Sequence, residues 1–324
     1  MIPTVTVVIP CYNEVGTLRE LYTRIRVEFE RLELQAEIIF IDDGSTDGTR
    51  EALRALAVED PLCRVVIFRC NCGKSAALQA GFALAQGEYI LTLDADLQDD
   101  PAEIPRFLEA LQSADVVSGW RTSRSNATDN VVMAPKLFNR AARSVTGVRL
   151  HDISSGWKGY RRQVPREVAV YGELHRCLPA LAAARGFRVA ELVVRHYPRR
   201  SGRSKYGNEQ FPHGFLDLLT VAYLTKYRFR PLQLFGGIGI SLMLVGLALG
   251  AVLSLYLTIP GIAPPPYWHF VMWLIALILL VLGPVFIALG VLAEAQLATA
   301  MPGLPPPPVA ERINCRDNEK AVDV

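Results

Sequence analysis

Two acidic side chains suited to holding a divalent cation lie at the end of a short apolar segment. Asp94 and Asp96 stand two residues apart where EYILTLD (88–94) ends. Carboxylate oxygens are hard ligands that suit magnesium or manganese. A solvated acidic loop would explain the pair taken alone. Its place after an apolar segment, with two similar segment ends elsewhere in the chain, favours a metal site.

Polar residues also follow two earlier apolar segments. The first, TVTVVIP (4–10), runs into Pro10-Cys11-Tyr12-Asn13-Glu14, and the second, AEIIFID (36–42), runs into Asp42-Asp43-Gly44-Ser45-Thr46-Asp47. By composition the second cluster is ordinary turn chemistry, and Asp47 could cap the next helix. An acidic edge repels a bare diphosphate unless a cation lies between them, so the three clusters together predict a cation-bridged diphosphate site.

The elements that must position these residues alternate in type. Apolar, β-branched segments at 4–10, 36–42, 63–68 and 88–94 are separated by helical patterns near 15–32, 47–58 and 74–85. This alternation predicts an α/β fold, a mostly parallel sheet with helices on both faces. Ligands bind beyond the carboxyl ends of such strands, where the acidic clusters lie.

Other site classes are excluded by spacing. No GxGxxG follows the first segment, and the string Gly73-Lys74-Ser75 lacks the leading P-loop glycine because that position is Phe68. The six cysteines are scattered apart from Cys70 and Cys72, so a zinc site is not expected. A net charge of +2 gives no polyanion-binding signature, and we expect no nucleic-acid partner.

Basic residues gather in the later part of the hydrophilic region. Arg121 and Arg124 follow DVVSGW (115–120), Lys136 and Arg140 lie in a predicted amphipathic helix near 132–146, and RHYPRRSGRSK occupies 195–205. A solvated basic face is the alternative. Because the last cluster precedes an amphipathic segment (211–227) and then apolar sequence, it favours an anionic group at a bilayer surface.

The C-terminal third predicts a transmembrane hairpin. No Asp, Glu, Lys or Arg occurs from Leu232 to Ala293, and TIPGIAPPPY divides this stretch into apolar runs at 232–257 and 268–293. Each run would rise about 39 Å as a helix, against a hydrocarbon core of about 30 Å. A buried core hairpin of this length without a charge would be unusual. We therefore expect a hydrophilic domain at 1–208, an amphipathic segment at 209–230, two spans within 231–294 and a flexible tail at 295–324.

Charge asymmetry predicts the orientation. Basic residues flank the hairpin outside its short uncharged loop, namely Lys226, Arg228, Arg230, Arg312, Arg316 and Lys320. Both termini and the hydrophilic domain are therefore expected in the cytoplasm. Glycines in the first span, including the GxxxG pair Gly246 and Gly250, suggest a homo-oligomer, with Gly236, Gly237 and Gly239 as further contacts.

The order of several motifs resembles one enzyme family. VVIPCYNE, IDDGSTDGT, NCGKSAAL, DADLQDDP, HDISSGWKGYRR, YGELHR and RRSGRSKYG, followed by two apolar spans, occur between residues 4 and 293. This order resembles the family 2 glycosyltransferases that load a sugar onto a polyprenyl phosphate, especially the bacterial two-helix and dolichyl-phosphate-mannose-synthase-like enzymes. The resemblance implies a GT-A fold, a nucleotide-sugar donor, a polyprenyl phosphate acceptor, Mg²⁺ or Mn²⁺, and a place in the bacterial inner membrane.

The resemblance also implies residue roles. The nucleotide-sugar site would comprise Pro10, Tyr12, Glu14, Asp42, Asp43, Lys74 and Asp94. The metal would be held by Asp94, Asp96 and Gln98. The acceptor phosphate would be bound by Arg121, Lys136, Arg203 and Lys205, with a lysine at 136 where some relatives have an arginine. Asp96, Asp152 and Arg121 would be the catalytic residues.

The implied reaction is inverting transfer, with UDP-glucose as the first expected donor and GDP-mannose as the second. A phosphate monoester has a second pKa of about 6 and is mostly dianionic at neutral pH, so no strong general base is required. We therefore expect Asp152 to orient the sugar or a basic side chain at least as much as it takes a proton.

Three alternatives are weaker. A processive polysaccharide synthase usually carries QxxRW, whereas this chain has Glu173-Leu174-His175-Arg176-Cys177, and two spans cannot enclose a polymer channel. A protein-glycosylating soluble transferase would not explain the hairpin. A non-catalytic nucleotide-binding scaffold predicts a broken DxD motif or a missing basic acceptor loop, and both are intact.

Overall fold

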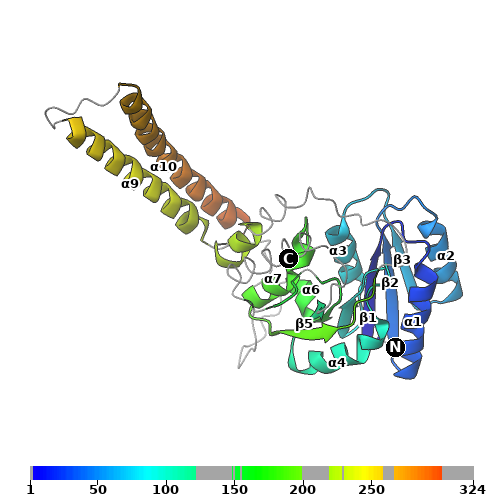
Figure 1. The fold of residues 1–324 in the computed structure, drawn as a ribbon. Helices are drawn as coiled ribbons and strands as arrows, with labels where there is room; N and C mark the ends of the chain where they lie inside the picture. Colours follow the sequence, from blue (N-terminus) through cyan, green and yellow to red (C-terminus); the bar gives the residue numbers. More distant parts are fainter. Residues whose placement is uncertain are drawn as a thin grey trace. The chain divides into compact units, whose positions relative to one another are not determined.

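The structure is a computed structural model that describes residues 3–121, 148, 150–153, 155–198, 219–227, 230–257 and 266–300. The chain divides into two compact units, Met1–Thr225 and Lys226–Val324. The first contains a seven-stranded sheet covered by helices, and the second contains two long apolar helices (Figure 1).

The sheet has the strand order β3-β2-β1-β4-β6-β5-β7. Its strands are β1 (Val5–Cys11), β2 (Ala36–Asp42), β3 (Cys63–Ile67), β4 (Tyr89–Thr92), β5 (Val116–Arg121), β6 (Lys158–Arg161) and β7 (Val189–Val194). The pairs β1–β2, β1–β4, β2–β3 and β5–β7 are parallel, whereas β6 is antiparallel to both β4 and β5. The predicted mostly parallel sheet is confirmed, and β6 is an antiparallel insertion that the strand pattern did not predict.

Helices cover both faces, as expected. Because side chains alternate along a strand, Val7 and Ile9 contribute to one apolar core and Val8 to the other. The first core also takes residues from α1 (Leu18–Arg31), α2 (Thr49–Glu59) and α4 (Ile104–Ser113). The second takes residues from α3 (Lys74–Leu84), α6 (Gln163–Glu167) and α7 (Leu178–Ala184). The sheet-containing unit also has two short turns, η1 (Pro101–Glu103) and η2 (Leu174–Cys177). Helical residues 219–222 run into the π-helical turn η3 (Tyr223–Tyr227).

One strand departs from the expected burial. After Cys63, the residues of β3 are only partly buried, whereas all seven residues of β2 are buried. Because β3 is at the edge of the sheet, fewer neighbours cover it.

The second unit is an antiparallel pair of helices. α9 (Pro231–Leu257) and α10 (Pro266–Ala300) are long and apolar enough to cross a membrane, and only 11% and 17% of their most apolar windows are buried within the chain. That exposure argues against a soluble core hairpin. α10 is longer than the predicted 268–293 and continues past Glu294, because AEAQLATA is rich in helix-favouring alanine. The expected tail boundary at 295 is therefore too early.

Glycines bring the two apolar helices together. A Cβ at Gly239 would lie 2.5 Å from the carbonyl oxygen of Gly283, and one at Gly246 would lie 2.9 Å from the carbonyl oxygen of Ala276. A Cβ at Gly237 would meet nothing within 4 Å. Two of the glycines expected at an oligomer contact therefore pack within the hairpin, and a homo-oligomer stays a prediction.

Candidate active site

The polar segment ends meet at one edge of the sheet. Cys11 pairs with Asp42 and Val8 with Thr92 in parallel register, so the chain after β1, β2 and β4 leaves the sheet on the same side. Asp94 and Asp96 follow β4 within two to four residues. The predicted clustering of the three segments is confirmed by this topology.

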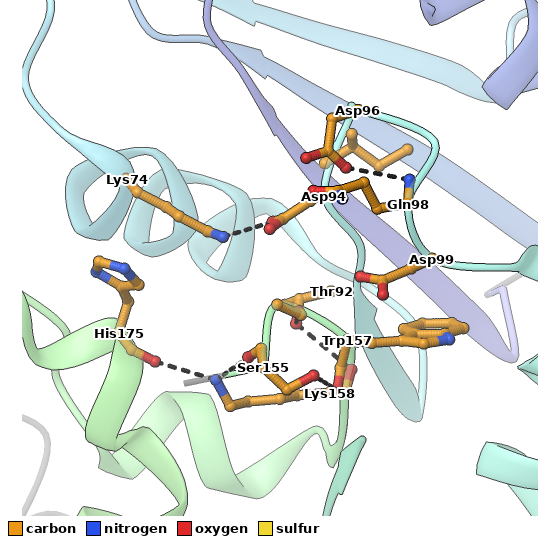
Figure 2. A network of polar contacts seen from close by, with 12 residues as sticks. Lys74, Thr92, Asp94, Asp96, Gln98, Asp99, Ser155, Trp157, Lys158 and His175 are labelled. Atoms are coloured by element: carbon orange, nitrogen blue, oxygen red, sulfur yellow. Dashed lines mark hydrogen bonds and ion pairs between the residues drawn. The ribbon is translucent and has the colours of Figure 1, made fainter. Parts of the chain in front are cut away.

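Asp94 is paired with a lysine from another element. Lys74, the first residue of α3, places Nζ 2.5 Å from Asp94 Oδ1, and the Asp94 side chain is 34% exposed (Figure 2). Burial opposes ionisation of this carboxyl, but Lys74, helped by Arg121, outweighs it and lowers the pKa of Asp94. Lys74 therefore compensates the charge of the carboxylate in this structure, and its role at a nucleotide stays a prediction.

The backbone of a distant segment packs against the same carboxylate. A Cβ at Gly156 would collide with Asp94 Oδ2, and the Gly156 carbonyl accepts a hydrogen bond of 3.0 Å from Thr92 Oγ1. Only a residue without a side chain fits here. The glycine of HDISSG thus lets the backbone lie directly against the carboxylate of Asp94.

The rest of the acidic loop is held by hydrogen bonds. Asp96 is 7% exposed, and its Oδ1 accepts a 3.2 Å bond from the backbone N–H of Gln98. The side-chain amide of Gln98 donates to the Tyr197 carbonyl at 3.2 Å. The next residue in the chain, Asp99, is buried, and its Oδ1 lies 3.1 Å from Nδ1 of His196. Burial raises the pKa of Asp99 despite that contact. The contact between Asp99 and His196 was not predicted, since the two residues are 97 positions apart in the sequence.

The segment after β2 is organised around two aspartates. Asp42 is fully buried, accepting from the Ser45 N–H at 3.1 Å and from Arg50 Nε at 3.0 Å. Asp43 accepts from the N–H groups of Cys72 and Gly73 at 2.7 and 3.0 Å, and burial raises its pKa. Both carboxylates therefore support loops in this structure, and a direct role at a nucleotide stays a prediction.

The segment after β1 is joined to the same loop. Asn13, with φ +54°, donates its N–H to Ser45 Oγ at 2.9 Å and accepts from the Thr46 N–H at 2.8 Å. The N–H of Glu14 donates to Thr49 Oγ1 at 2.9 Å. Pro10 is within β1, and Tyr12 lies partly exposed between it and Asn13. Gly48 is the N-cap residue of α2, and Asp47, expected to cap this helix, accepts through Oδ1 from the Thr49 N–H at 3.0 Å.

Asp152 and Arg121 form a two-point ion pair. Nε and one terminal nitrogen of Arg121 donate to the two carboxylate oxygens at 2.6 and 3.0 Å. The arginine side chain is only 13% exposed, and although burial opposes its charge, Asp152 raises the pKa of Arg121. Glu191 of β7 accepts from the N–H groups of both His151 and Asp152, which fixes this segment. Asp152 therefore contacts a basic side chain, and its role in catalysis stays a prediction.

Two further functional-type side chains, a lysine and a histidine, are buried near Asp94. Lys158 of β6 and His175 of η2 are both buried (Figure 2). The His175 Nδ1 shares a hydrogen bond of 2.9 Å with Ser75 Oγ. Burial, then the nearby ammonium of Lys74, lowers the pKa of His175 well below its usual value. Nothing in the spacing of these residues predicted this cluster; the one available signal is a lysine inside the otherwise uncharged string SSGWKGY.

The acidic loop fits a divalent cation that is shared with a ligand. Among the described residues, no group of three or more His, Cys, Asp and Glu side chains is arranged to hold a metal. Mg²⁺ commonly takes one or two protein carboxylates and completes its shell with water and phosphate oxygens. Asp94, Asp96 and the amide oxygen of Gln98 suit that arrangement. Lys136, Arg203 and Lys205 lie outside the described residues.

Comparison with known proteins gives a family. The profile for glycosyl transferase family 2 matches residues 6–168. A dodecaprenyl-phosphate galacturonate synthase of Rhizobium johnstonii is 35% identical over 257 residues, covering 78% of this chain and 75% of the relative. An undecaprenyl-phosphate 4-deoxy-4-formamido-L-arabinose transferase of Aeromonas hydrophila subsp. hydrophila is 38% identical over 258 residues, covering 77% and 79%.

The fold is similar to that of solved enzymes. A glucosyl-3-phosphoglycerate synthase from Mycobacterium tuberculosis, crystallised with phosphoglyceric acid, matches with a TM-score of 0.52 and 20% identity over 69% of this chain and 80% of that one. The same enzyme with Mn²⁺, UDP-glucose and phosphoglyceric acid matches with a TM-score of 0.51 and 21% identity, covering 68% and 80%. At these identities the similarity concerns the fold.

Proposed function

The chain belongs to glycosyl transferase family 2, and we propose that it transfers a sugar from a nucleotide-sugar to the phosphate of a membrane polyprenyl phosphate. Two relatives above 30% identity are named for sugar transfer to dodecaprenyl and undecaprenyl phosphates. The observation that carries the proposal is that one chain combines the Asp94–Asp96 edge with two helices apolar enough to cross a membrane.

In the proposed step, an oxygen of the lipid phosphate attacks the anomeric carbon of the donor sugar. The bond from that carbon to the nucleoside diphosphate breaks, and the anomeric configuration inverts. Asp94, Asp96 and Gln98 would hold Mg²⁺ or Mn²⁺, which when bound stabilises negative charge on the leaving diphosphate. The structure of a similar fold with Mn²⁺ and UDP-glucose supports divalent-metal dependence.

Asp152 acts in this scheme through Arg121. Both carboxylate oxygens of Asp152 already accept hydrogen bonds from the guanidinium, and a dianionic phosphate needs no strong base. Arg121, oriented in this way, contributes positive charge for the acceptor phosphate, together with Lys136, Arg203 and Lys205. The remaining members of the proposed nucleotide site are Pro10, Tyr12, Glu14, Asp42, Asp43 and Lys74.

The membrane assignment belongs to the same proposal. α9 and α10 would span the bacterial inner membrane, with both termini and the sheet-containing unit in the cytoplasm, where nucleotide-sugars are made. The basic flanks and uncharged loop of the hairpin support this orientation.

The identity of the donor sugar is a separate part of the proposal. UDP-glucose is the first candidate from the sequence and GDP-mannose the second, whereas the two relatives are named for galacturonate and 4-deoxy-4-formamido-L-arabinose. A donor panel must therefore include nucleotide-linked forms of all four sugars.

The test is transfer by the purified full-length protein in detergent. Undecaprenyl phosphate, Mn²⁺ or Mg²⁺ and the donor panel are incubated with wild type and with Asp96→Asn, and the lipid fraction is analysed by mass spectrometry. We expect a new lipid-phosphate-sugar mass with one donor, lost on chelation and reduced about 100-fold or more in the variant. Metal-dependent nucleotide binding without product from any donor would contradict the proposal and favour a nucleotide-binding scaffold.

A further inference from the structure

Lys158 is a buried cation whose recorded partners are both neutral. It is 3% exposed and opens β6, opposite Thr92 of β4 in the antiparallel register. Its ammonium donates to the carbonyl oxygens of Ser155 and His175, the latter at 3.4 Å (Figure 2). No carboxylate of the described residues lies within ion-pair distance of it.

Such an arrangement costs stability. Burial removes the hydration of the ammonium, and two carbonyl dipoles replace it only in part. Burial, and then repulsion from Lys74, lowers the pKa of Lys158 to about 7, against the opposing influence of Asp152 and Asp94. An apolar side chain of similar length would avoid this cost. A lysine here therefore calls for a role other than stability.

The two carbonyls belong to segments that hold the acidic edge. On one side, Ser155 precedes Gly156, whose backbone packs against the carboxylate of Asp94. On the other side, His175 is hydrogen-bonded to Ser75 of α3, the neighbour of Lys74. Since Lys74 pairs with Asp94, the contacts close a ring. Lys158 joins the Ser155–Gly156 segment to the His175 turn and so completes this ring.

We infer that Lys158 is a positioning residue for sugar transfer, tying the Ser155–Gly156 peptide and the His175 turn together so that Asp94 is held in its productive place. The inference rests on the proposed function. Lys158 touches neither substrate nor cation in this role, and acts through Gly156 on one side and through His175, Ser75 and Lys74 on the other. Its charge also adds positive potential beneath a site for anionic diphosphate.

The test compares substitutions at Lys158 with a matched control in full-length protein. Lys158→Met removes the charge and both hydrogen bonds while keeping the length of the side chain. Arg161→Met is the control, because Arg161 is also a cation of β6 that donates to backbone carbonyls, those of Leu111, Gln112 and Ala114 at the end of α4. The measurements are kcat and KM for the donor, the unfolding temperature, and the affinity for the donor nucleotide in Mn²⁺.

We expect Lys158→Met to lower kcat about 100-fold, the cost of a misplacement of about 1 Å, with a smaller change in KM and an unfolding temperature no lower than that of wild type. Arg161→Met should instead lower the unfolding temperature and leave kcat unchanged. Lys158→Arg, which keeps the charge with a wider head, should lie between wild type and Lys158→Met, and it decides the question if the methionine variant does not fold. Wild-type turnover in either Lys158 variant, or activity that falls only in step with stability, would overturn the inference.

Failure of the proposed function is distinguishable. If wild type transfers no sugar from any donor, the transferase proposal fails, yet nucleotide binding in Mn²⁺ still reports on the position of Asp94. Lys158→Met should then weaken that binding about 10-fold, and unchanged binding would overturn the positioning role by itself.

Discussion

At the scale of single residues, the charges of the site are compensated in pairs. Lys74 neutralises Asp94, and Arg121 forms two hydrogen bonds with Asp152. A bidentate guanidinium–carboxylate pair fixes the direction of both groups and is stronger than a single contact. The pair therefore behaves as one unit, and its two members should not make independent contributions to catalysis.

This interdependence predicts the outcome of a double-mutant cycle. Arg121→Lys, which cannot form the fork, and Asp152→Asn, which removes the charge, should each lower kcat/KM about 100-fold, and the double variant should be little worse than either. The measurement is steady-state transfer with the identified donor. If Asp152→Asn alone abolished turnover with donor binding intact, and the effects multiplied, Asp152 would be a general base.

The buried charge of Lys158 predicts a pH-dependent stability. Its pKa is about 7 in the folded chain against 10.5 for the reference lysine. Between these values the unfolded chain binds more protons, so this group favours folding increasingly as pH rises through the window, and its cost is fully present below it. The unfolding temperature of Lys158→Met should exceed that of wild type most at about pH 6 and least at about pH 9. For Arg161→Met, the difference in unfolding temperature from wild type should not change with pH. The same result for Lys158→Met would show that the ammonium of Lys158 is not buried.

At the scale of secondary-structure elements, glycines decide how closely α9 and α10 approach. Gly239 faces the carbonyl of Gly283, whereas Gly237, two residues earlier, has open space around its missing side chain. Small residues at a contact between two membrane helices let the backbones pack closely without a hydrophobic driving force. The same helix thus offers a sensitive position and a tolerant one.

The prediction is a difference between two substitutions. Gly239→Leu should force the helices apart and lower the temperature at which the detergent-solubilised protein aggregates by several degrees, whereas Gly237→Leu should leave it nearly unchanged. Size-exclusion chromatography after heating measures both. If both variants were equally destabilised, the assignment of Gly239, and not Gly237, to the contact between α9 and α10 would be wrong. Gly237 would then lie in a contact with a second copy of the chain.

At the scale of the whole molecule, a sheet-containing unit is joined to an apolar hairpin. A polyprenyl phosphate keeps its tail in the bilayer and presents its phosphate at the surface. A transferase for it needs both a water-exposed site for the nucleotide-sugar and a membrane anchor. Only one side of the membrane supplies the donor, so the orientation of the hairpin is part of the function.

Reporter fusions test that orientation in bacteria. A fluorescent protein fused after Val324 should fluoresce, and alkaline phosphatase at the same position should be inactive, because each reporter works on only one side of the membrane. Alkaline phosphatase inserted between α9 and α10, near Ile262, should be active. The opposite pattern would place the termini outside the cytoplasm and exclude nucleotide-sugar use there.

Local signals were enough to predict most of the framework and part of the site. The early strands, the helices between them and the two apolar runs follow from periodicity and composition, which depend on neighbours in the chain. Parallel strands point their carboxyl ends the same way, so the meeting of the segments after β1, β2 and β4 also followed. Asp94 and Asp96 were therefore predictable from the sequence alone.

Tertiary structure alone decided which polar side chains face one another. Lys74 and Asp94 are 20 residues apart, Arg121 and Asp152 are 31 apart, and Ser75 and His175 are 100 apart. Sequence spacing carries no information on such contacts, because they depend on how the elements pack. One such feature is the antiparallel insertion of β6 between β4 and β5. That insertion brings Gly156 against Asp94 and buries Lys158 below it. The sequence therefore determined the types of side chain available at the edge of the sheet, and the packing of β6 determined which of them are buried, paired and held in place.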